Sequence, residues 1–434
     1  MRSGQNWYAG PGRALRGVLE MPGDKSISHR AVMLAALADG MSRIDGFLEG
    51  EDTRATAKIF GQMDVRIETP SPSTRIVHGV GVDGLKAPDG ALDCGNSGTG
   101  MRLLAGLLAG QAFDSILTGD ASLGKRPMRR VTEPLARMGA RVETGSGGTP
   151  PLRIHGGQTL AGCAHVLEVA SAQVKSALLL AGLYARGETS VVEPRPTRDY
   201  TERMLSAFGV EVAFSPGFAR LRGGQRLRAK DIHVPADFSS AAFFLVAASI
   251  VPGSDLTLRQ VGLNPRRTGL LHVLRHMGAD IVEENASDCD GEPVADLRVR
   301  YAPLHGIEVP VALVPDMIDE FPALFVAATC ADGPTVVQGA SELRVKESDR
   351  IAAMAEGLRT LGVRVDEAPD GAVIHPGPLG GGTVESRDDH RIAMAFAVAA
   401  QRASGEVHIR DVANVATSFP GFDALARSAG CFLE

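Results

Sequence analysis

The sequence predicts a mixed α/β fold built from six repeated units, which form two similar halves of three units each. Two kinds of segment, each occurring six times, support this fold class. One kind is a helix-like run followed by a glycine or its equivalent and a short alternating strand, at a spacing of roughly 70 residues. The other is a longer apolar run that begins at hydroxyl or charged side chains and ends near a glycine. We therefore expect two helices and several strands in each unit.

The helix-to-strand segments follow one another along the whole chain. A glycine at the end of a helix favours a left-handed cap, from which the chain turns into the next strand. Asp64 takes the place of this glycine in the first copy, and aspartate tolerates the left-handed conformation better than most residues. In chain order, the segments are residues 59–68, 134–143, 204–212, 273–282, 358–365 and 425–433.

The longer apolar runs alternate with these segments. The first is expected to end at Asp39 and Gly40. Residues 21–26 and 234–239 share one pattern almost half a chain apart, with Phe238 in the second copy where Lys25 stands in the first. This match indicates a duplicated architecture of two three-unit domains. In chain order, the six runs are residues 26–40, 97–110, 171–187, 239–253, 319–333 and 389–405.

Composition places the chain among globular proteins and argues against several partners. Its 434 residues allow at least two domains, and a net charge of −6 without a basic block argues against nucleic acid. Five scattered cysteines without a Cys-x-x-Cys pair argue against a disulfide framework or a zinc site and fit a reducing cytoplasm. No apolar run approaches the ~18 residues that span a bilayer. We therefore expect a soluble cytoplasmic protein without a metal site. A monomer that acts on small molecules is a separate expectation, which composition does not decide.

Residues 22–30, Pro-Gly-Asp-Lys-Ser-Ile-Ser-His-Arg, carry the strongest functional signal. The start of a helix offers free N–H groups and the positive end of the helix dipole, both of which favour an anion. Two cations there, Lys25 and Arg30, should cost stability unless an anion binds. A solvated helix start is the alternative interpretation. Lysine is rare, with seven among 45 basic residues, and Lys25, Lys125, Lys175 and Lys346 lie in motif-like segments.

Other polar clusters lie at helix starts or in the loops before them. Residues 93–102 form a small-residue turn that resembles a phosphate-binding loop but matches neither the dinucleotide nor the Walker A spacing. Residues 119–128 place two cations in a loop bounded by glycines. Residues 171–176 open a helix with hydroxyl and amide groups suited to phosphate or hydroxyl binding. Tight caps or solvated loops remain alternatives for these segments.

Carboxylates form a second group of candidates. Residues 316–322 place three carboxylates ahead of an apolar helix, where capping accounts for one or two and a general base for another. Residues 344–350 alternate in charge, which also fits a solvated helix face. His390 is more typical of a capping or packing residue than of a catalyst, and no metal-ligand spacing occurs. Cations at helix starts with isolated carboxylates favour an enzyme for anionic substrates that transfers protons.

Five of these motifs together resemble those of the 5-enolpyruvylshikimate-3-phosphate synthase (3-phosphoshikimate 1-carboxyvinyltransferase) family. The resemblance extends from about Gly12 to the C-terminus. Two further motifs, at residues 171–176 and 416–420, are similar to the bacterial class II branch. The five motifs are Pro-Gly-Asp-Lys-Ser-Ile-Ser-His-Arg at 22–30, Gly-Asn-Ser-Gly-Thr at 95–99, Lys-Arg-Pro-Met at 125–128, Arg-Val-Lys-Glu-Ser-Asp-Arg at 344–350 and Asp-His-Arg-Ile-Ala-Met at 389–394.

The resemblance implies a specific version of the predicted fold. Each of the two domains would consist of three βαβαββ units arranged as an inside-out α/β barrel. The first domain would span residues 24–237, and the second would be discontinuous, made of residues 1–23 and 238–434. The resemblance places the active site in the cleft between the two domains, where helix N-termini converge.

The resemblance also implies the reaction and the residues that perform it. The enolpyruvyl group of phosphoenolpyruvate would pass to the 5-hydroxyl of shikimate 3-phosphate through a tetrahedral intermediate, with no cofactor or metal. Asp319 would be the base on the hydroxyl, Glu347 would handle the C3 proton and Lys25 would contact both substrates. Shikimate 3-phosphate would be bound by Lys25, Ser26, Arg30, Ser171, Gln173, Arg198, Asp319 and Lys346. Phosphoenolpyruvate would be bound by Lys25, Gly98, Arg126, Gln173, Arg350 and Arg391.

Three positions bear on how far the resemblance extends. Ala172 stands where many family members have a second serine, so phosphate binding is expected to depend more on Arg198 and Lys346. Thr417 takes the place of a lysine of the class I branch, and that lysine's role is not carried over. Insensitive members of the class II branch carry alanine at the position of Gly98, so the herbicide glyphosate is expected to inhibit this chain.

Two rival functions remain at this stage. The related enolpyruvyl transferase acting on UDP-N-acetylglucosamine carries a reactive cysteine in the loop that corresponds to residues 121–127, and this chain has none there. A rival of another class is a non-catalytic anion-binding protein in which Asp319 and Glu347 are helix caps only. Release of phosphate from shikimate 3-phosphate and phosphoenolpyruvate would separate the three.

Overall fold

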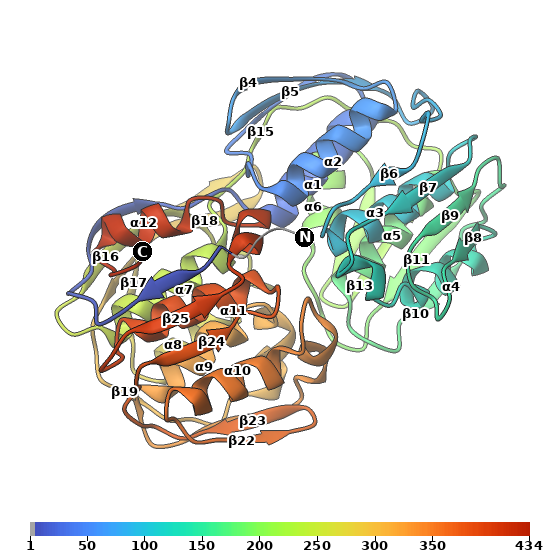
Figure 1. Ribbon diagram of the computed structural model, residues 1–434. Coiled ribbons are helices and arrows are strands. Elements are labelled where there is room, and N and C mark those ends of the chain that lie inside the picture. The colour runs from blue at the N-terminus through green and yellow to red at the C-terminus, as the bar shows by residue number, and fades with distance from the viewer. Residues whose placement is uncertain (1–4) are drawn as a thin grey trace. The chain divides into compact units, whose positions relative to one another are not determined.

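The computed structural model describes residues 5–434 and is a mixed α/β structure (Figure 1). Its contacts divide the chain into two compact units. We call Gly23–Val234 the central unit, and we call the segment up to Pro22 together with Pro235–Glu434 the terminal unit. Residues 1–4, which the sequence assigned to the second domain, lie outside the described residues.

The central unit alternates buried helices, half-exposed helices and short strands. Its helices are α1 (Lys25–Leu37), α2 (Glu51–Gln62), α3 (Gly98–Ala109), α4 (Arg129–Arg137), α5 (Ala172–Gly182) and α6 (Tyr200–Ala207), with the 3₁₀ turn η1 (Leu123–Lys125). Its strands are β3 (Ala38–Asp45), β4 (Arg66–Ser71), β5 (Thr74–Val80), β6 (Leu92–Asp93), β7 (Ser115–Thr118), β8 (Arg141–Thr144), β9 (Leu152–His155), β10 (Ala164–Val166), β11 (Glu188–Val192), β12 (Val212–Ser215), β13 (Phe218–Arg222), β14 (Leu227–Arg228) and β15 (Ile232–His233).

The terminal unit repeats this alternation. Its helices are α7 (Phe238–Ile250), α8 (Gly269–His276), α9 (Phe321–Thr329), α10 (Arg350–Thr360), α11 (His390–Ala400) and α12 (Phe422–Ala429), with 3₁₀ segments η2 (Val311–Met317), η3 (Ser341–Val345) and η4 (Ala413–Thr417). Its strands are β1 (Trp7–Ala9), β2 (Arg16–Glu20), β16 (Asp255–Gly262), β17 (Asp280–Cys289), β18 (Glu292–Arg300), β19 (Leu304–His305), β20 (Ala331–Asp332), β21 (Thr335–Val337), β22 (Val365–Ala368), β23 (Gly371–Ile374), β24 (Gly382–Glu385) and β25 (Val407–Arg410).

One strand pattern recurs in the sheets and confirms the repeats. A parallel pair is extended by an antiparallel strand and then by a second one, as in β6-β7-β9-β8 and β10-β11-β13-β12 of the central unit. In the terminal unit, β2-β16-β18-β17 has the same pattern. Strands from far along the chain complete other sheets, since β14 and β15 pair with β3, and β1 pairs with β25. The sheets of residues 5–434 are open, and none closes into a barrel.

The two kinds of helix differ in burial, as the apolar runs predict. All residues of α7 and α9 are buried, and α11 is buried except for Arg391. In the central unit, α1, α3 and α5 are buried over most of their lengths. The partner helices, such as α4 and α12, bury only one side, which fits a position between the core and solvent. In each unit, burial of the apolar helices supplies the main hydrophobic stabilisation.

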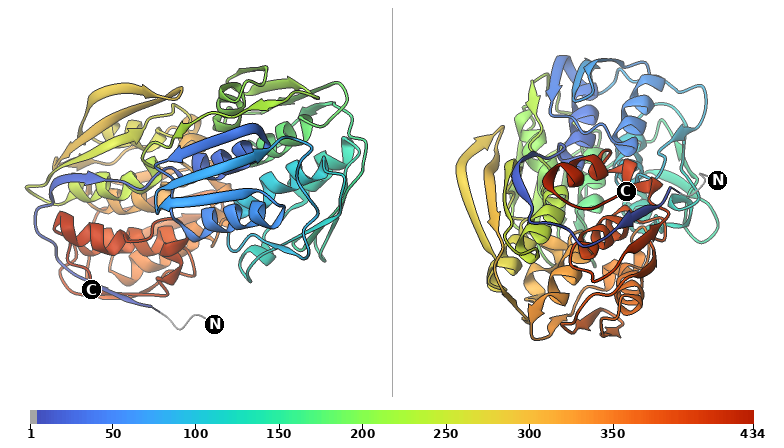
Figure 2. Two further views of the ribbon diagram at one scale, coloured as in Figure 1. Left: turned by 90° about the horizontal axis from the view of Figure 1, so that it is seen from above. Right: turned by 60° about the vertical axis from the view of Figure 1, so that its left-hand side comes forward.

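Sheets cover these helices within each unit. The hairpin of β22 and β23 packs against α9 and α10 (Figure 1). In the left view of Figure 2, the sheet of β3, β4 and β5 lies over α1 and α2, which its contacts bear out. Buried helices covered by sheets on their outer side agree with the inside-out arrangement that the resemblance implied.

The turns from helix to strand agree with the sequence in all six copies. Asp64 has a φ of 70°, and Gly139, Gly209, Gly278, Gly362 and Gly430 also have positive φ values. The prediction that the first buried helix ends at Asp39 and Gly40 was wrong. Helix α1 ends at Leu37 and passes directly into β3, because Ala38 is already extended and residues 39–45 pair with β5. Gly40, with a φ of +113°, lies inside that strand.

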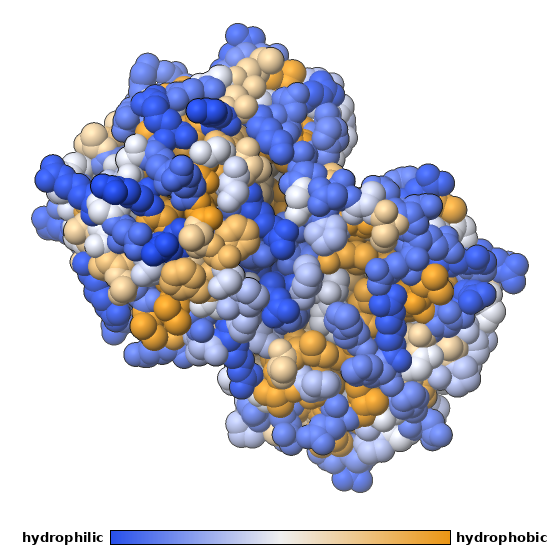
Figure 3. Space-filling model, turned by 180° about the vertical axis from the view of Figure 1, so that it is seen from behind, coloured by the Kyte–Doolittle hydropathy of each residue, from blue (hydrophilic) through white to orange (hydrophobic). Residues whose placement is uncertain are grey.

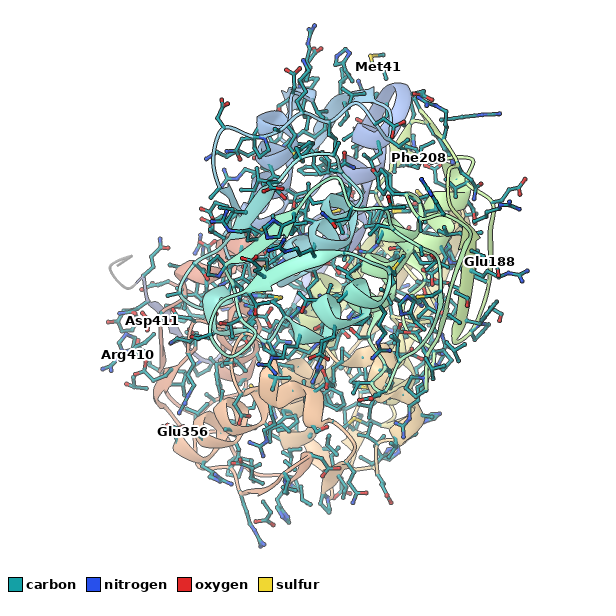
Figure 4. All side chains as sticks on the ribbon, turned by 90° about the vertical axis from the view of Figure 1, so that its right-hand side faces the viewer. Met41, Glu188, Phe208, Glu356, Arg410 and Asp411 are labelled. Atoms are coloured by element: carbon teal, nitrogen blue, oxygen red, sulfur yellow. The ribbon has the colours of Figure 1, made fainter. Side chains whose placement is uncertain are left out.

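Charged side chains are spread over the surface. Hydrophilic groups cover most of the face in Figure 3, with smaller hydrophobic groups among them. In Figure 4, Glu356 and Arg410 project from the terminal unit, where Arg387 pairs with Glu356 and Arg410 pairs with Glu385. Exposed pairs of this kind contribute little to stability. Within residues 5–434, no helix combines the length and the apolar character needed to cross a bilayer.

Candidate active-site residues

Each unit carries its own cluster of the predicted site residues. In the central unit, the cluster is built on the N-termini of α1, α3 and α5. Asp24 caps α1 by accepting from the Ile27 N–H at 2.8 Å, which leaves Lys25 and Ser26 in the first turn. The ammonium of Lys25 forms an ion pair with Asp52, a nearly buried residue of α2. This pair fixes the Lys25 side chain at the start of α1.

Arg30 lies one turn further along α1 and is buried. Its Nε donates to Thr201 Oγ1 at 2.7 Å and its Nη2 donates to Ser176 Oγ at 2.8 Å, so that one guanidinium connects α1, α5 and α6. Burial and the neighbouring charge of Arg198 lower the pKa of Arg30 to about 10, although it stays protonated at neutral pH. Two arginines close enough to repel each other are suited to bind an anion.

His29 lies between these cations and is also buried. Its Nδ1 is 2.8 Å from Thr56 Oγ1 and its Nε2 is 3.3 Å from Ser97 Oγ, the N-cap of α3. Burial, followed by the charges of Lys25 and Arg30, lowers the pKa of His29 well below 6.5. The imidazole is therefore neutral at physiological pH and acts as a structural link between helices α1, α2 and α3.

The start of α3 approaches Arg126 closely. Gly98 is the first residue of the helix, and a Cβ atom there would lie 2.8 Å from Arg126 Nη1 and 3.1 Å from Arg102 Nη1. Arg126 is nearly buried and donates to Asn96 Oδ1 at 2.9 Å. The missing side chain of Gly98 thus leaves space for the Arg126 guanidinium above the positive end of the helix.

The start of α5 is tied to α3. Ser171 caps the helix by accepting from the Val174 N–H, and Gln173 follows in the first turn. Gln173 accepts from Arg102 Nη1 at 2.6 Å and donates to Thr99 Oγ1 at 2.8 Å. The central unit therefore brings the anion-binding candidates together through three helix starts.

The cluster of the terminal unit surrounds Arg350, the first residue of α10. Its side chain is 1% exposed. Nε donates to Asp389 Oδ2 at 2.8 Å, Nη2 donates to Glu347 Oε2 at 2.7 Å, and Nη1 lies 3.4 Å from Asp319 Oδ1. Burial opposes the charge of Arg350, but Asp389, Glu347 and Asp319 outweigh this effect and raise its pKa. Both predicted catalytic carboxylates thus share one buried cation.

Asp319 has further cations around it. Lys346 Nζ is 3.8 Å from Oδ1, and Arg267 Nη1 is 3.5 Å from Oδ2. Arg267 also reaches Asp237, the N-cap of α7, at 3.3 Å. A cation near each carboxylate oxygen fixes the orientation of Asp319, as a positioned proton acceptor requires.

Arg391 lies in the first turn of α11, and its backbone N–H donates to the Asp389 cap at 3.0 Å. Its charge acts on Glu320, a fully buried neighbour of Asp319. Burial first, and then the charge of Asp319 against the opposing cations, raises the pKa of Glu320. The terminal unit therefore gathers Asp319, Lys346, Glu347, Arg350 and Arg391 around the starts of α9, α10 and α11.

Sequence reasoning missed four residues in these clusters. Asp52, Arg102, Arg267 and Glu320 each contact a predicted site residue, from positions between one and 71 residues away. Glu320 and Arg102 lay in segments that the sequence singled out, residues 316–322 and 93–102, without being chosen as site residues, and the other two gave no local signal. The structure also places the two residues that depart from the family pattern. Ala172 is buried in the first turn of α5, and Thr417 donates to the Asn414 carbonyl at 2.7 Å.

Residues 5–434 contain no group of three or more histidine, cysteine or acidic side chains arranged to hold a metal ion. Among the lysines singled out by the sequence, Lys25, Lys175 and Lys346 are each near a carboxylate and largely shielded from solvent. Lys125, by contrast, is exposed. Three of the four lysines are therefore held as paired charges, while the fourth lies on the surface.

Comparisons with known proteins show the family to which the chain belongs. A sequence profile of EPSP synthase (3-phosphoshikimate 1-carboxyvinyltransferase) matches residues 10–425. A protein named 3-phosphoshikimate 1-carboxyvinyltransferase from Xanthomonas campestris pv. campestris (strain B100) is 76% identical over 428 residues, covering 99% of this chain and 98% of its own length. One with the same name from Xanthomonas oryzae pv. oryzae (strain PXO99A) is 75% identical over 429 residues, with the same coverage of both chains.

Solved structures give the same result. The structure of EPSP synthase from Acinetobacter baumannii has a TM-score of 0.89, 52% sequence identity and 99% coverage of both chains. The enolpyruvyl transferase NikO from Streptomyces tendae has a TM-score of 0.79 at 18% identity, covering 99% of this chain and 98% of its own, which shows a shared fold. The family profile and the full-length identities show that this chain belongs to the EPSP synthase family.

Proposed function

We propose that this enzyme transfers the enolpyruvyl group of phosphoenolpyruvate to the 5-hydroxyl of shikimate 3-phosphate, giving 5-enolpyruvylshikimate 3-phosphate and phosphate. Family membership supports the reaction class. The structural observation that supports the chemistry most directly is that Asp319 and Glu347 both contact the buried guanidinium of Arg350. Two carboxylates on one cation suit a reaction in which two protons move.

In this proposal, Asp319 takes the proton of the 5-hydroxyl of shikimate 3-phosphate while the oxygen of that hydroxyl bonds to C2 of phosphoenolpyruvate. Glu347 gives a proton to C3, which makes a methyl group and leaves a tetrahedral C2. The bond from C2 to the phosphate oxygen then breaks while C3 returns its proton to Glu347, and the double bond forms again. The departing phosphate carries away the hydroxyl proton in the overall balance. Positioned acid–base groups of this kind contribute typically ~10²–10⁴-fold to the rate.

Cations supply the binding energy for the two anionic substrates. Shikimate 3-phosphate is assigned to Lys25, Ser26, Arg30, Ser171, Gln173, Arg198, Asp319 and Lys346. Phosphoenolpyruvate is assigned to Lys25, Gly98, Arg126, Gln173, Arg350 and Arg391. The hydrogen bonds of Arg30 and of Gln173 support these assignments, because they hold both side chains in place before a ligand arrives. Charge-assisted hydrogen bonds to phosphate are about twice as strong as neutral ones.

The reaction is tested by phosphate release. The purified enzyme is incubated with shikimate 3-phosphate and phosphoenolpyruvate, and the phosphate and the enolpyruvyl ether are both quantified. One ether per phosphate is expected, with neither product when one substrate is omitted. UDP-N-acetylglucosamine serves as the competing acceptor, and turnover with it in place of shikimate 3-phosphate would contradict the proposal. Binding of both anions without turnover would identify a non-catalytic anion-binding protein.

Finer assignments belong to the same proposal. The motifs at residues 171–176 and 416–420 support the class II branch. We also propose that the enzyme acts in the cytoplasm, which its scattered free cysteines fit, and that it is a monomer. Light scattering after size-exclusion chromatography tests the oligomeric state, because a dimer would have twice the mass of the 45.5 kDa chain.

A further inference from the structure

The central unit contains a buried ion cluster that the proposed reaction does not use. Lys175 Nζ lies 2.8 Å from Glu193 Oε2 and 2.8 Å from Glu202 Oε1. The three side chains are 3%, 0% and 1% exposed. Removing three charges from water costs several kcal/mol per ion, and well-packed apolar residues often stabilise such a site equally well. Stability alone is therefore a weak reason for this cluster.

The cluster brackets the segment that carries Arg198. Glu193 follows β11 and Glu202 belongs to α6, so Lys175 reaches both ends of residues 193–202. Glu193 also binds the middle of the segment, since it accepts from the Thr197 backbone N–H at 3.3 Å and from the Thr197 hydroxyl. Thr197 directly precedes Arg198. The position of the Arg198 backbone is thus defined by contacts that end at Lys175.

Lys175 itself is fixed to the phosphate-binding helix start. It lies on α5, and its backbone N–H donates to the carbonyl oxygen of Ser171 at 3.1 Å, one turn earlier. Ser171 and Gln173 are both assigned to shikimate 3-phosphate. The ion cluster therefore joins the helix that carries two of the binding residues to the segment that carries a third.

A second set of contacts runs beside the cluster and joins the same elements. Thr201 accepts from Arg30 and donates to Ser176 Oγ at 2.7 Å, next to Lys175 on α5. Tyr200 donates to Asp24, the cap of α1, at 3.2 Å. The start of α6 is therefore held against α1 as well as α5. Arg198 lies directly before this anchored turn.

Charge in the cluster is unbalanced, with two carboxylates on one ammonium. Burial is the main reason that the pKa of Glu202 is raised. Burial opposes the charge of Lys175, but Glu202 and Glu193 outweigh it and raise its pKa. Glu202 also favours the charged form of Arg30. The negative charge of Glu202 thus acts on Arg30, which is assigned to shikimate 3-phosphate, and it opposes the effect of Arg198 on that arginine.

We propose that Lys175 is a positioning residue for shikimate 3-phosphate, which holds Arg198 toward the phosphate group by fixing both ends of residues 193–202 to α5. This inference rests on the proposed function. It makes no claim that Lys175 touches the substrate. Its effect is on the affinity for shikimate 3-phosphate and passes through Arg198, so that phosphoenolpyruvate binding and the proton transfers are left nearly unchanged.

The primary test is Lys175→Met, measured by calorimetric binding of shikimate 3-phosphate and by steady-state kinetics. We expect the Kd for shikimate 3-phosphate to rise about ten-fold or more, because Arg198 should be displaced by about an ångström. The KM for phosphoenolpyruvate at saturating shikimate 3-phosphate should change less than about two-fold, within the usual error of such additivity arguments. A general loss of folding would lower the active fraction without separating the two substrates.

A double-mutant cycle with Arg198→Ala tests the route of the effect. If Lys175 acts through Arg198, then Lys175→Met should cost little further affinity once Arg198→Ala is present. Leu180→Ala is the matched control, since Leu180 is buried on the same helix and its apolar side chain belongs to the hydrophobic core of the unit. This control is expected to lower the midpoint of urea unfolding, because a buried leucine is truncated, with unchanged affinity for shikimate 3-phosphate.

Glu202→Gln keeps the proposal testable if Lys175→Met does not fold. This substitution leaves the pair of Lys175 and Glu193 intact and charge-balanced. The affinity for shikimate 3-phosphate should fall about three-fold or more, and the loss should again depend on the presence of Arg198. Additive effects with Arg198→Ala, or an equal effect of Leu180→Ala, would overturn the inference while leaving the proposed function intact. A wild-type protein that does not bind shikimate 3-phosphate would overturn both.

Discussion

Arg350 donates from Nη2 to Glu347 Oε2 at 2.7 Å, and Glu347 is only three residues earlier in the chain. The same guanidinium lies 3.4 Å from Asp319, which comes from a different part of the sequence. Two hydrogen bonds also hold Arg350 to Asp389, and they restrict the movement of its guanidinium relative to Asp319 and Glu347. The relative position of the two carboxylates is therefore set by a buried cation, and their substitution is the most direct test of the chemistry.

Asp319→Asn should lower kcat by ~10²–10⁴-fold, because an amide cannot take the hydroxyl proton. Binding of shikimate 3-phosphate should remain largely intact, since the substituted side chain keeps its size. Rapid-quench measurement of the first turnover separates the chemical step from product release. Loss of binding with an unchanged kcat would make Asp319 a structural residue.

Glu347→Gln should also lower kcat by ~10²–10⁴-fold, but through the proton at C3. The amide oxygen can still accept from Arg350, so the local structure is expected to persist. Hydrogen exchange at C3 of phosphoenolpyruvate, followed in deuterated water, should slow in parallel with turnover. Exchange at the wild-type rate in this variant would assign the proton to another group.

Much of this arrangement was predictable because its signals are local. Asp24, Ser97, Ser171 and Asp389 all cap helices through side-chain hydrogen bonds to N–H groups two or three residues later. Cap residues and apolar runs encode such contacts within a few positions. The same locality explains why the glycine turns and the six repeats were visible in the sequence.

The rest depends on contacts across the chain. Lys175 meets Glu193 and Glu202, and Arg267 meets Asp319 across 52 residues, with no spacing that marks these pairs. The end of α1 was misjudged for a similar reason, because pairing of β3 with a later strand decides where the helix stops. Tertiary contacts of this kind override a local pattern.

Lys25→Ala should nearly abolish turnover. Lys25 is the charge assigned to both substrates, and its pairing with Asp52 fixes it at the start of α1. A variant that keeps more than about a tenth of the wild-type kcat/KM, a loss under ~1.4 kcal/mol, would contradict this role. Lys58→Ala is the control, because Lys58 is an exposed lysine of α2 in the same unit and should leave kcat/KM unchanged.

His29 should make the free energy of unfolding depend on pH below pH 6.5, the ordinary pKa of a histidine. Its pKa is lowered in the folded protein, so below pH 6.5 the unfolded chain binds a proton that the folded chain does not. The free energy of unfolding should then fall with falling pH, by at most about 1.4 kcal/mol per unit from this group. Above pH 6.5 the imidazole is neutral in both states, and this contribution is constant.

Urea unfolding between pH 5 and 7.5 measures this slope. His29→Asn should flatten it, although His165, whose pKa is lowered by burial, adds a smaller dependence of the same sign. His272→Asn serves as the control, because His272 is exposed. Equal slopes for the wild type and His29→Asn would show that other groups control stability in this range.

Gly98→Ala should weaken inhibition by glyphosate about ten-fold or more, while the KM for phosphoenolpyruvate rises less, because one methyl group in a tight pocket is worth ~1–3 kcal/mol. The added Cβ would lie 2.8 Å from Arg126 Nη1, so the guanidinium assigned to phosphoenolpyruvate must move. Glyphosate is the longer molecule and should tolerate this displacement less well. The inhibition constant against phosphoenolpyruvate, measured for both proteins, provides the comparison.

Gly124→Ala is the matched control for this substitution. Gly124 precedes Lys125 in the neighbouring loop, and a Cβ atom there has no heavy atom within 4 Å beyond its chain neighbours. It should therefore leave both the inhibition constant and the KM unchanged. Equal inhibition constants for the wild type and Gly98→Ala, or a wild type that is already insensitive, would show that residues other than Gly98 set the response. Ala172 and Thr417 would then be the positions to substitute next, because they are where this chain departs from the family pattern.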